Sequence, residues 1–149
     1  MQFATESLYD VMDEVAPLIC RHWEHIALDK DTIPLKPDWD VYKNLQDLGK
    51  LNITTAREAG ELVGYAVYIV AQSLHYSDEV FADADIFWLS PEHRKGTAGM
   101  RLLKHAEASL KDSGVTKVFN KVKLHFDVGR VFERMGYQPI ERVYAKGLV

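Results

Sequence analysis

The sequence predicts one small α/β domain, and three observations carry that prediction. Its 149 residues suffice for a single substantial core. Segments with helical spacing of apolar residues are interspersed with short apolar runs that are typical of strands. No linker, internal repeat or low-complexity tract divides the chain. The expected order is α-α-β-β-β-α-β-α-β, and a short first strand near Phe3 is left open.

Two amphipathic helices are expected in the N-terminal third. Apolar residues recur at helical spacing over residues 7 to about 28, where Pro17 should kink or interrupt the helix. A polar, proline-containing loop covers residues 29–37. The second helix then runs over residues 38–48, with Asp38 as its N-cap.

Three strands are expected in the middle of the chain. Residues 51–57 and 62–71 flank a turn at residues 58–61, which predicts an antiparallel hairpin. The second of these strands is apolar on both faces, as a central strand should be. The third strand covers residues 82–89, and Ser90-Pro91 ends it.

The C-terminal half returns to alternating elements. A helix is expected over residues 99–111, a strand over 115–123 and a short helix over 127–135, which Gly136 ends. Residues 137–148 should supply one or two last strands.

The composition argues against several classes of protein. The net charge of −4 disfavours a nucleic-acid partner. The longest apolar run, Tyr65–Ala71, is far shorter than the roughly 20 residues that cross a bilayer, and the N-terminus has no signal-peptide pattern. Cys20, the one cysteine, excludes an intramolecular disulfide and fits a reducing cytoplasm; its apolar neighbours suggest a small core residue.

The segment from Asp83 to Leu103 carries the clearest functional signal. A buried strand runs into a proline, then into a basic, glycine-containing loop, and then into a helix. Small residues let the backbone approach a ligand, and the free N–H groups of a first helical turn attract anions. Arg94 and Lys95 add full positive charges beside them, which suits a pyrophosphate. The alternative is that the glycines only shape a tight turn. Neither the P-loop motif nor the GxGxxG motif is present.

This segment resembles the acetyl-CoA-binding motif of the GNAT acetyltransferases, Q/R-x-x-G-x-G/A at the start of a helix. Arg94 matches the first position and Gly99 the last, while Thr97 stands where the first glycine is usual and Gly96 lies one residue earlier. The string FERMGY at residues 132–137 resembles the family's late helix. The resemblance implies a single-domain GNAT fold over residues 1–149, with a mixed and splayed central sheet flanked by helices. It also implies a set of acetyl-CoA-binding loop residues: Arg94, Lys95, Gly96, Thr97, Ala98 and Gly99.

A narrower resemblance concerns small GNAT proteins encoded by tailed phages and prophages. It is carried by HWEHIALDKD, LVGYAVYIV, LHY, the strand with Asp85, and ERMGY. For a phage-encoded protein it implies the host cytoplasm as the location.

The GNAT resemblance further implies how acetyl transfer proceeds. The backbone of the splayed strand, at Phe87, Trp88 and Leu89, would pair with the pantetheine arm and stabilise charge on the acetyl oxygen. The acceptor amine attacks the thioester directly, so no enzyme nucleophile is needed.

Three residues are candidates for the catalytic step. Asp85 lies on the splayed strand, where relatives often place an acid that removes the amine's proton. Asp83 and Asp85 point to the same side, which either solvent or an active-site cleft would explain. His75 and Tyr76 follow the central strand and could reach the same cleft, or be ordinary loop residues.

Further candidates contact the acceptor or the cofactor arm. His22 and Glu24 lie on the first helix, which borders the acceptor pocket in this family. His22 and His25 lack a clear third ligand, so no metal is expected. His125 stands where relatives often have an asparagine facing the cofactor arm. Phe132 replaces the tyrosine that often protonates the departing thiolate.

The sequence therefore predicts an acetyl-CoA-dependent N-acetyltransferase that acts on a primary amine. The acceptor is a small molecule, a protein lysine or an N-terminus, and the acids Asp85, Glu24 and Glu79 would suit a cationic one. The alternative is a catalytically weak or inactive phage protein with a structural or host-interaction role. A homodimer is left open, with the apolar segment around Val143 and Tyr144 as one route.

Overall fold

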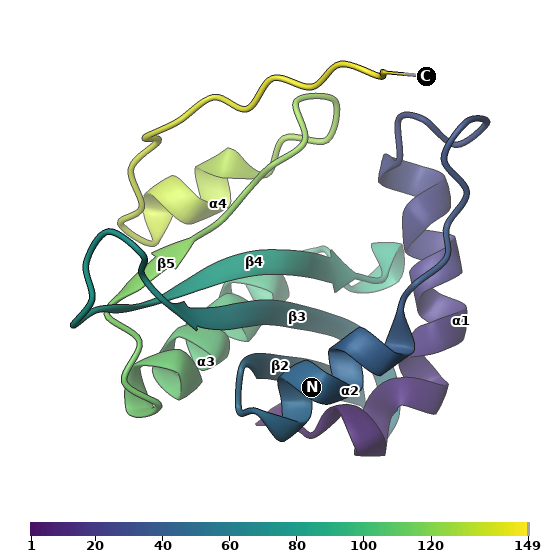
Figure 1. Ribbon diagram of the computed structural model, residues 1–149. Coiled ribbons are helices and arrows are strands. Elements are labelled where there is room, and N and C mark those ends of the chain that lie inside the picture. Colours follow the sequence, from purple (N-terminus) through teal and green to yellow (C-terminus); the bar gives the residue numbers. More distant parts are fainter. Residues whose placement is uncertain (149) are drawn as a thin grey trace.

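Five strands form one mixed sheet whose spatial order follows the sequence (Figure 1). The computed structural model describes residues 1–148. The strands are β1 (Gln2–Thr5), β2 (Leu51–Glu58), β3 (Glu61–Gln72), β4 (Val80–Leu89) and β5 (Lys117–Phe119). The first four are antiparallel to their neighbours, and β5 lies parallel to β4. The short strand near Phe3 is thus present, and the predicted hairpin is confirmed.

Helices cover both faces of this sheet. They are α1 (Leu8–Ile26), α2 (Trp39–Asp47), α3 (Ala98–Asp112) and α4 (Gly129–Arg134), with a short 3-10 turn at Pro91–His93. Ser7 caps α1, and Asp38 caps α2 as expected. Pro17 does not interrupt α1, because the apolar stripe on both sides of it stays packed on the sheet.

Two hydrophobic cores lie on opposite faces of the sheet. Side chains of β3 alternate between them, so that Tyr65 and Val67 face α1 and α2, whereas Ala66 and Tyr68 face α3. The alternation explains why the sequence of this strand is apolar on both faces. None of the helices within the described chain is both long and apolar enough to cross a membrane.

The strands β4 and β5 separate after a short paired stretch. Only Phe81–Asp83 pair with β5, so from Ala84 to Leu89 the strand β4 has a partner on the β3 side alone. The chain that follows β5 runs away from β4 toward the top of Figure 1. We call Ala84–Leu89 the open edge of β4. The predicted mixed and splayed sheet is therefore confirmed.

Three expectations were wrong. The strand expected over 115–123 is confined to β5, and no strand follows it up to residue 148. The apolar side chains of the expected C-terminal strands find no partner: Val143 is 79% and Tyr144 85% exposed. Cys20 is exposed rather than in the core, because it lies next to the buried stripe of α1 and not on it.

Candidate functional site

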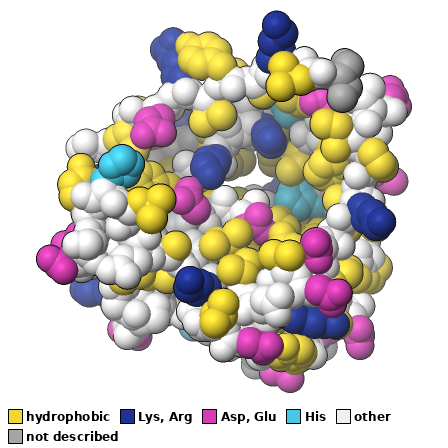
Figure 2. All heavy atoms as spheres, in the orientation of Figure 1, with side chains coloured by type: hydrophobic (Ala, Val, Ile, Leu, Met, Phe, Trp, Pro, Cys, Tyr) yellow, Lys and Arg dark blue, Asp and Glu magenta, His cyan; other side chains and the backbone are white. Residues whose placement is uncertain are grey.

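The open edge of β4 presents backbone groups toward the space that β5 has left. Ser90 N–H donates to the carbonyl of Val63 at 2.8 Å, so Ser90 points toward β3. Because neighbouring residues of an antiparallel strand alternate in direction, the N–H and C=O groups of Phe87 and Leu89 point away from β3. Figure 2 shows the molecule hollowed there, between β4, α1 and the C-terminal segment.

A bulge places Asp85 on the α2 side of this edge. Val67 pairs with Ile86 and Tyr68 pairs with Ala84, which leaves Asp85 without a residue opposite. The Tyr42 hydroxyl, on α2, donates a hydrogen bond of 2.5 Å to Oδ2 of Asp85. Burial, and then this bond, raise the pKa of Tyr42 above its usual range. Asp85 is therefore in contact with α2 through Tyr42, and the residue is exposed.

Sequence reasoning missed Tyr42. In the sequence it is one member of the apolar stripe of the second helix, and its spacing carries no sign of a catalytic partner. Only the packing of α2 on the sheet brings it to a strand residue 43 positions away.

His22 lies buried at the end of the same face. Its ring centroid is 6.4 Å from those of Tyr65 and Trp88, which are neighbours across β3 and β4. Burial, followed by the positive charge of Arg94, lowers the pKa of His22 to about 4. His22 is therefore a neutral imidazole at physiological pH. The Tyr65 hydroxyl and Trp88 Nε1 beside it have no hydrogen-bond partner among the described residues.

The other candidates on α1 point elsewhere. Glu24 and His25 are exposed, and Nδ1 of His25 lies 2.6 Å from the carbonyl oxygen of Arg21. Across residues 1–148, no cluster of three potential metal ligands is found.

The loop before α3 has the geometry of an anion site. Gly96 adopts a φ of +74°, which a glycine tolerates without strain. Thr97 caps α3 without a side-chain hydrogen bond. Within the described chain, the N–H groups of Ala98, Gly99 and Met100 have no hydrogen-bond partner. A Cβ at Gly99 would lie 3.7 Å from Cζ of Phe87, so this helix begins directly beside the open edge.

Arg94 connects this loop to the open edge. Its Nε donates to the Leu89 carbonyl at 2.7 Å, and its guanidinium lies 5.1 Å from the centre of the Phe126 ring. Lys95 next to it is exposed. One of the edge carbonyls is thus already occupied by the chain itself.

The remaining candidates are His125, His75 and Tyr76, and none of them lies on the open edge of β4. His125 donates from Nε2 to the carbonyl of Ile26 at 3.1 Å, which ties the loop after β5 to the end of α1. Tyr76 packs against Phe81 at the start of β4, with ring centroids 6.1 Å apart. Asp85 lies four residues further along β4 than Phe81, about 13 Å away. No hydrogen bond or ion pair joins His75 or Tyr76 to Asp85.

Phe132 lies on the far side of the open edge. Its ring packs against those of Phe87 at 6.5 Å and Tyr137 at 5.4 Å, and only 7% of it is exposed. This position therefore offers no proton donor.

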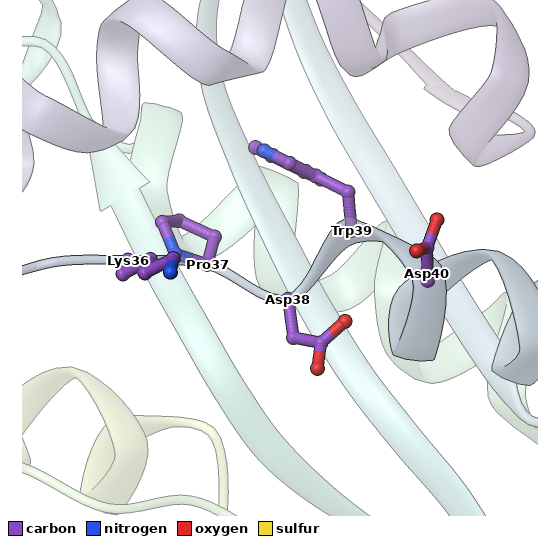
Figure 3. A pocket seen from close by; sticks show the side chains of 5 residues that line it. All are labelled: Lys36, Pro37, Asp38, Trp39 and Asp40. Atoms are coloured by element: carbon purple, nitrogen blue, oxygen red, sulfur yellow. The ribbon is translucent and has the colours of Figure 1, made fainter.

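A shallow surface depression lies at the start of α2 (Figure 3). It is lined by five consecutive residues, Lys36, Pro37, Asp38, Trp39 and Asp40. The side chains of Asp38 and Trp39 point in opposite directions. The Trp39 ring lies 5.8 Å from that of Tyr42, so the depression adjoins the residue that holds Asp85.

Comparisons with known proteins agree with this geometry. The model of the acetyltransferase (GNAT) family matches residues 12–137. A ribosomal-protein-alanine N-acetyltransferase from Brucella melitensis biovar Abortus 2308 is 17% identical, with a TM-score of 0.72 and coverage of 99% of this chain and 100% of that one. A glucosamine-6-phosphate N-acetyltransferase from Arabidopsis thaliana is 12% identical, with a TM-score of 0.73 and full coverage of both chains (100% and 100%).

A third similar structure is an aminoglycoside acetyltransferase from an uncultured soil metagenomic sample, in complex with sisomicin. It is 13% identical, with a TM-score of 0.70 and coverage of 98% of this chain and 96% of that one. No curated protein sequence matches the chain significantly.

Proposed function

Because the chain belongs to the acetyltransferase (GNAT) family, and is thus an N-acetyltransferase, we propose that it transfers the acetyl group of acetyl-CoA to a primary amine that arrives as a cation and is deprotonated before attack. The observation that carries this proposal is the open edge of β4 lying directly beside the start of α3, whose first N–H groups donate to no side-chain cap. An extended backbone edge and an anion site in contact match the two parts of the cofactor, its amide-containing arm and its pyrophosphate.

The residues present fit acetyl-CoA at both places. The free N–H groups at the start of α3 and the side chains of Arg94 and Lys95 would hold the pyrophosphate. The small residues Gly96, Ala98 and Gly99 leave the backbone accessible. The edge-facing groups of Phe87 and Leu89 would pair with the amides of the arm, as an added strand does. Arg94 must then release the Leu89 carbonyl.

When bound, acetyl-CoA supplies a thioester whose carbonyl carbon accepts the amine and whose sulfur leaves. An edge N–H of β4 would stabilise the negative charge that develops on the acetyl oxygen. Asp85 would bind the acceptor as an ammonium ion and receive its proton, since only the neutral amine attacks. One N–C bond forms and one C–S bond breaks. The nitrogen loses two protons: the first passes to the Asp85 carboxylate before attack and from there to solvent, and the second passes from the nitrogen to solvent after attack, while coenzyme A leaves as the thiolate.

The charges at the start of α2 and at Asp85 support a cationic acceptor. Asp38 lies beside the indole of Trp39, whereas Asp40 lies 4.0 Å from the Lys43 ammonium and Lys36 lines the same surface, so the uncompensated negative charge belongs to Asp38 and Asp85. Carboxylates next to aromatic faces favour a cationic ligand. The names of the three similar structures mention a ribosomal-protein alanine, glucosamine 6-phosphate and an aminoglycoside, all of which carry amino groups. We therefore place a cationic amine on the α2 side of the edge.

A second candidate function rests on Phe132. Its buried ring cannot protonate a departing thiolate, which suits a phage protein that binds acetyl-CoA but turns it over poorly and acts by interaction. A thiol with a pKa of about 8.5 leaves as the thiolate without an acid, so the enzymatic proposal remains the stronger. Thiol release separates the two.

The first experiment is calorimetric titration of the protein with acetyl-CoA. We expect micromolar binding to the wild type and at least a tenfold weaker affinity for Arg94→Ala/Lys95→Ala. The matched control is Lys104→Ala/Lys111→Ala, which removes the same charge from exposed positions further along α3 and should bind as the wild type does. No binding to folded, ligand-free wild type would overturn the proposal.

The second experiment measures release of coenzyme A with sisomicin, glucosamine 6-phosphate and a peptide that begins with alanine as acceptors. Turnover of any of them supports acetyl transfer. Tight binding of acetyl-CoA without turnover of any amine in the panel favours the interaction role instead.

A further inference from the structure

Tyr42 of α2 contacts Asp85 in the bulge of β4 and can fix the orientation of its carboxylate. Asp85 is the extra residue of the bulge, so no residue opposite on β3 fixes its position. The 2.5 Å bond from the Tyr42 hydroxyl reaches only Oδ2 of its carboxylate. Among the described residues, Oδ1 has no hydrogen-bond or ion-pair partner and remains free for a ligand.

The neighbouring carboxylate provides an internal comparison. Asp83 lies two residues earlier on the same strand, and its Oδ1 forms an ion pair of 3.1 Å with the Lys121 ammonium. The charge of Asp83 is thereby compensated. Asp85 is held by a neutral hydroxyl instead, so its negative charge stays available to a cation.

Tyr42 is itself firmly placed. Its ring packs on the core between α1, α2 and the sheet, and lies 5.8 Å from the ring of Trp39. Burial and the bond to Asp85 raise its pKa, so the phenol stays protonated through the pH range of an assay and always acts as the donor. The hydroxyl therefore orients the carboxylate without competing for its role as proton acceptor.

We propose that Tyr42 is the positioning residue for Asp85, holding Oδ2 so that Oδ1 faces the acceptor ammonium at the open edge of β4. This inference rests on the proposed acetyl transfer and adds a second element, α2, to the catalytic apparatus. It also implies that the acceptor binds on the α2 side of the open edge of β4.

The test is a double-mutant cycle on the amine of the panel that is acetylated fastest: sisomicin, glucosamine 6-phosphate or the alanine peptide. Asp85→Asn should lower kcat/KM by about 100-fold or more. Tyr42→Phe keeps the ring and should lower kcat/KM about tenfold, through loss of one hydrogen bond to a charged group. Because Tyr42 acts through Asp85, Tyr42→Phe should change Asp85→Asn less than about twofold further.

Two controls separate positioning from general damage. Tyr9→Phe removes another tyrosine hydroxyl bond to an aspartate between α1 and α2, the 2.8 Å contact with Asp47, and should leave kcat/KM unchanged. Asp83→Asn removes a carboxylate from the same strand and should have little effect. The Kd of acetyl-CoA should stay at the wild-type value in both Tyr42→Phe and Asp85→Asn.

A spectroscopic measurement tests the contact without turnover. The ¹³Cζ resonance of labelled Tyr42 should move on Asp85→Asn substitution and stay in place on Asp83→Asn substitution. A wild-type kcat/KM in Tyr42→Phe would overturn the inference while acetyl transfer stands. So would a double variant whose loss of kcat/KM equals the product of the two single losses, because Tyr42 would then act independently of Asp85. Wild type that acetylates no amine of the panel overturns the proposed function, and the role of Tyr42 falls with it even if the resonance moves.

Discussion

Arg94 donates a hydrogen bond from Nε to the carbonyl oxygen of Leu89 at 2.7 Å. This bond occupies one of the backbone acceptors on the open edge of β4. The same carbonyl faces the side on which we place the cofactor arm. Under the proposed function the bond and the arm would compete, and pairing of the arm with the strand would free Arg94 to turn toward the pyrophosphate.

This competition predicts a change at Arg94 on binding. The ¹⁵Nε–H resonance of Arg94 should shift during titration with acetyl-CoA, in step with the calorimetric saturation. Arg57 is the internal control, because its Nε is bonded to Glu6 at 3.0 Å in an ion-pair cluster on β2, away from the open edge of β4. An Arg94 signal that stays constant at saturation contradicts the displacement of this bond.

His22 predicts a stability that depends on pH. Burial, then the charges of Arg94 and His25, lower its pKa to about 4 from the ordinary 6.5. Between pH 6.5 and about 4, His22 is protonated in the unfolded chain and neutral in the folded protein. The free energy of unfolding therefore falls as the pH drops through this range. The loss amounts to about 3 kcal/mol at most.

Urea unfolding of wild type and His22→Gln at pH 7, 5.5 and 4 measures this effect. The variant should be less stable at pH 7 and lose less of its remaining stability on acidification. His75→Gln is the control, because His75 is exposed and should leave the pH dependence of the wild type intact. Equal slopes for wild type and His22→Gln would show that His22 is not the group responsible.

The close approach of β4 to Gly64 on β3 leaves no space for a side chain at this position. A Cβ at this position would lie 2.7 Å from Cδ1 of Leu89 and 2.9 Å from the carbonyl oxygen of Trp88. A backbone atom cannot give way as a flexible side chain does, so Gly64→Ala should destabilise the protein by about 1–3 kcal/mol. It should also weaken acetyl-CoA binding, because the displaced residues form the open edge.

Gly99 is the matched comparison for Gly64. Its nearest neighbour for an added Cβ is Cζ of Phe87 at 3.7 Å, an ordinary contact, and it lies in the first turn of α3. Gly99→Ala should leave the unfolding free energy unchanged or raise it by up to about 1 kcal/mol. Chemical denaturation of both variants checks the pair. A Gly64→Ala protein as stable as Gly99→Ala contradicts the close approach.

The elements with strong periodic patterns could be predicted from the sequence. The stripe of α1, the cap at Asp38, the apolar run of β3 and the glycine-containing loop before α3 all act locally, and each formed where expected. Residues 137–148 show why pattern alone is insufficient. They carry apolar side chains typical of strands, yet a strand needs a partner, and none is in reach within the described chain.

The contacts of the site were less accessible to sequence reasoning than the loop itself. The positions of Arg94 and Gly99 follow from a short motif, because a helix start is a local structure. The contact between Tyr42 and Asp85, and the burial of His22 between Tyr65 and Trp88, depend on how separate elements pack. No spacing along the chain encodes them.

Phe132 predicts a variant with a higher rate. Phe132→Tyr would add a phenol, with a pKa of about 10, beside the place where we expect the thiolate to leave. If protonation of the thiolate limits turnover below pH 8, kcat should rise about threefold or more, while the KM of acetyl-CoA changes little.

Phe81→Tyr is the control for this variant, because it adds the same hydroxyl at the far end of β4, where Tyr76 and Phe119 surround the ring. It should leave kcat unchanged. A kcat of Phe132→Tyr equal to that of the wild type, at unchanged stability, would mean that the thiolate leaves without an acid. In that case Phe132 gives no reason to regard the protein as a weak catalyst, and the interaction role loses the one observation that favours it.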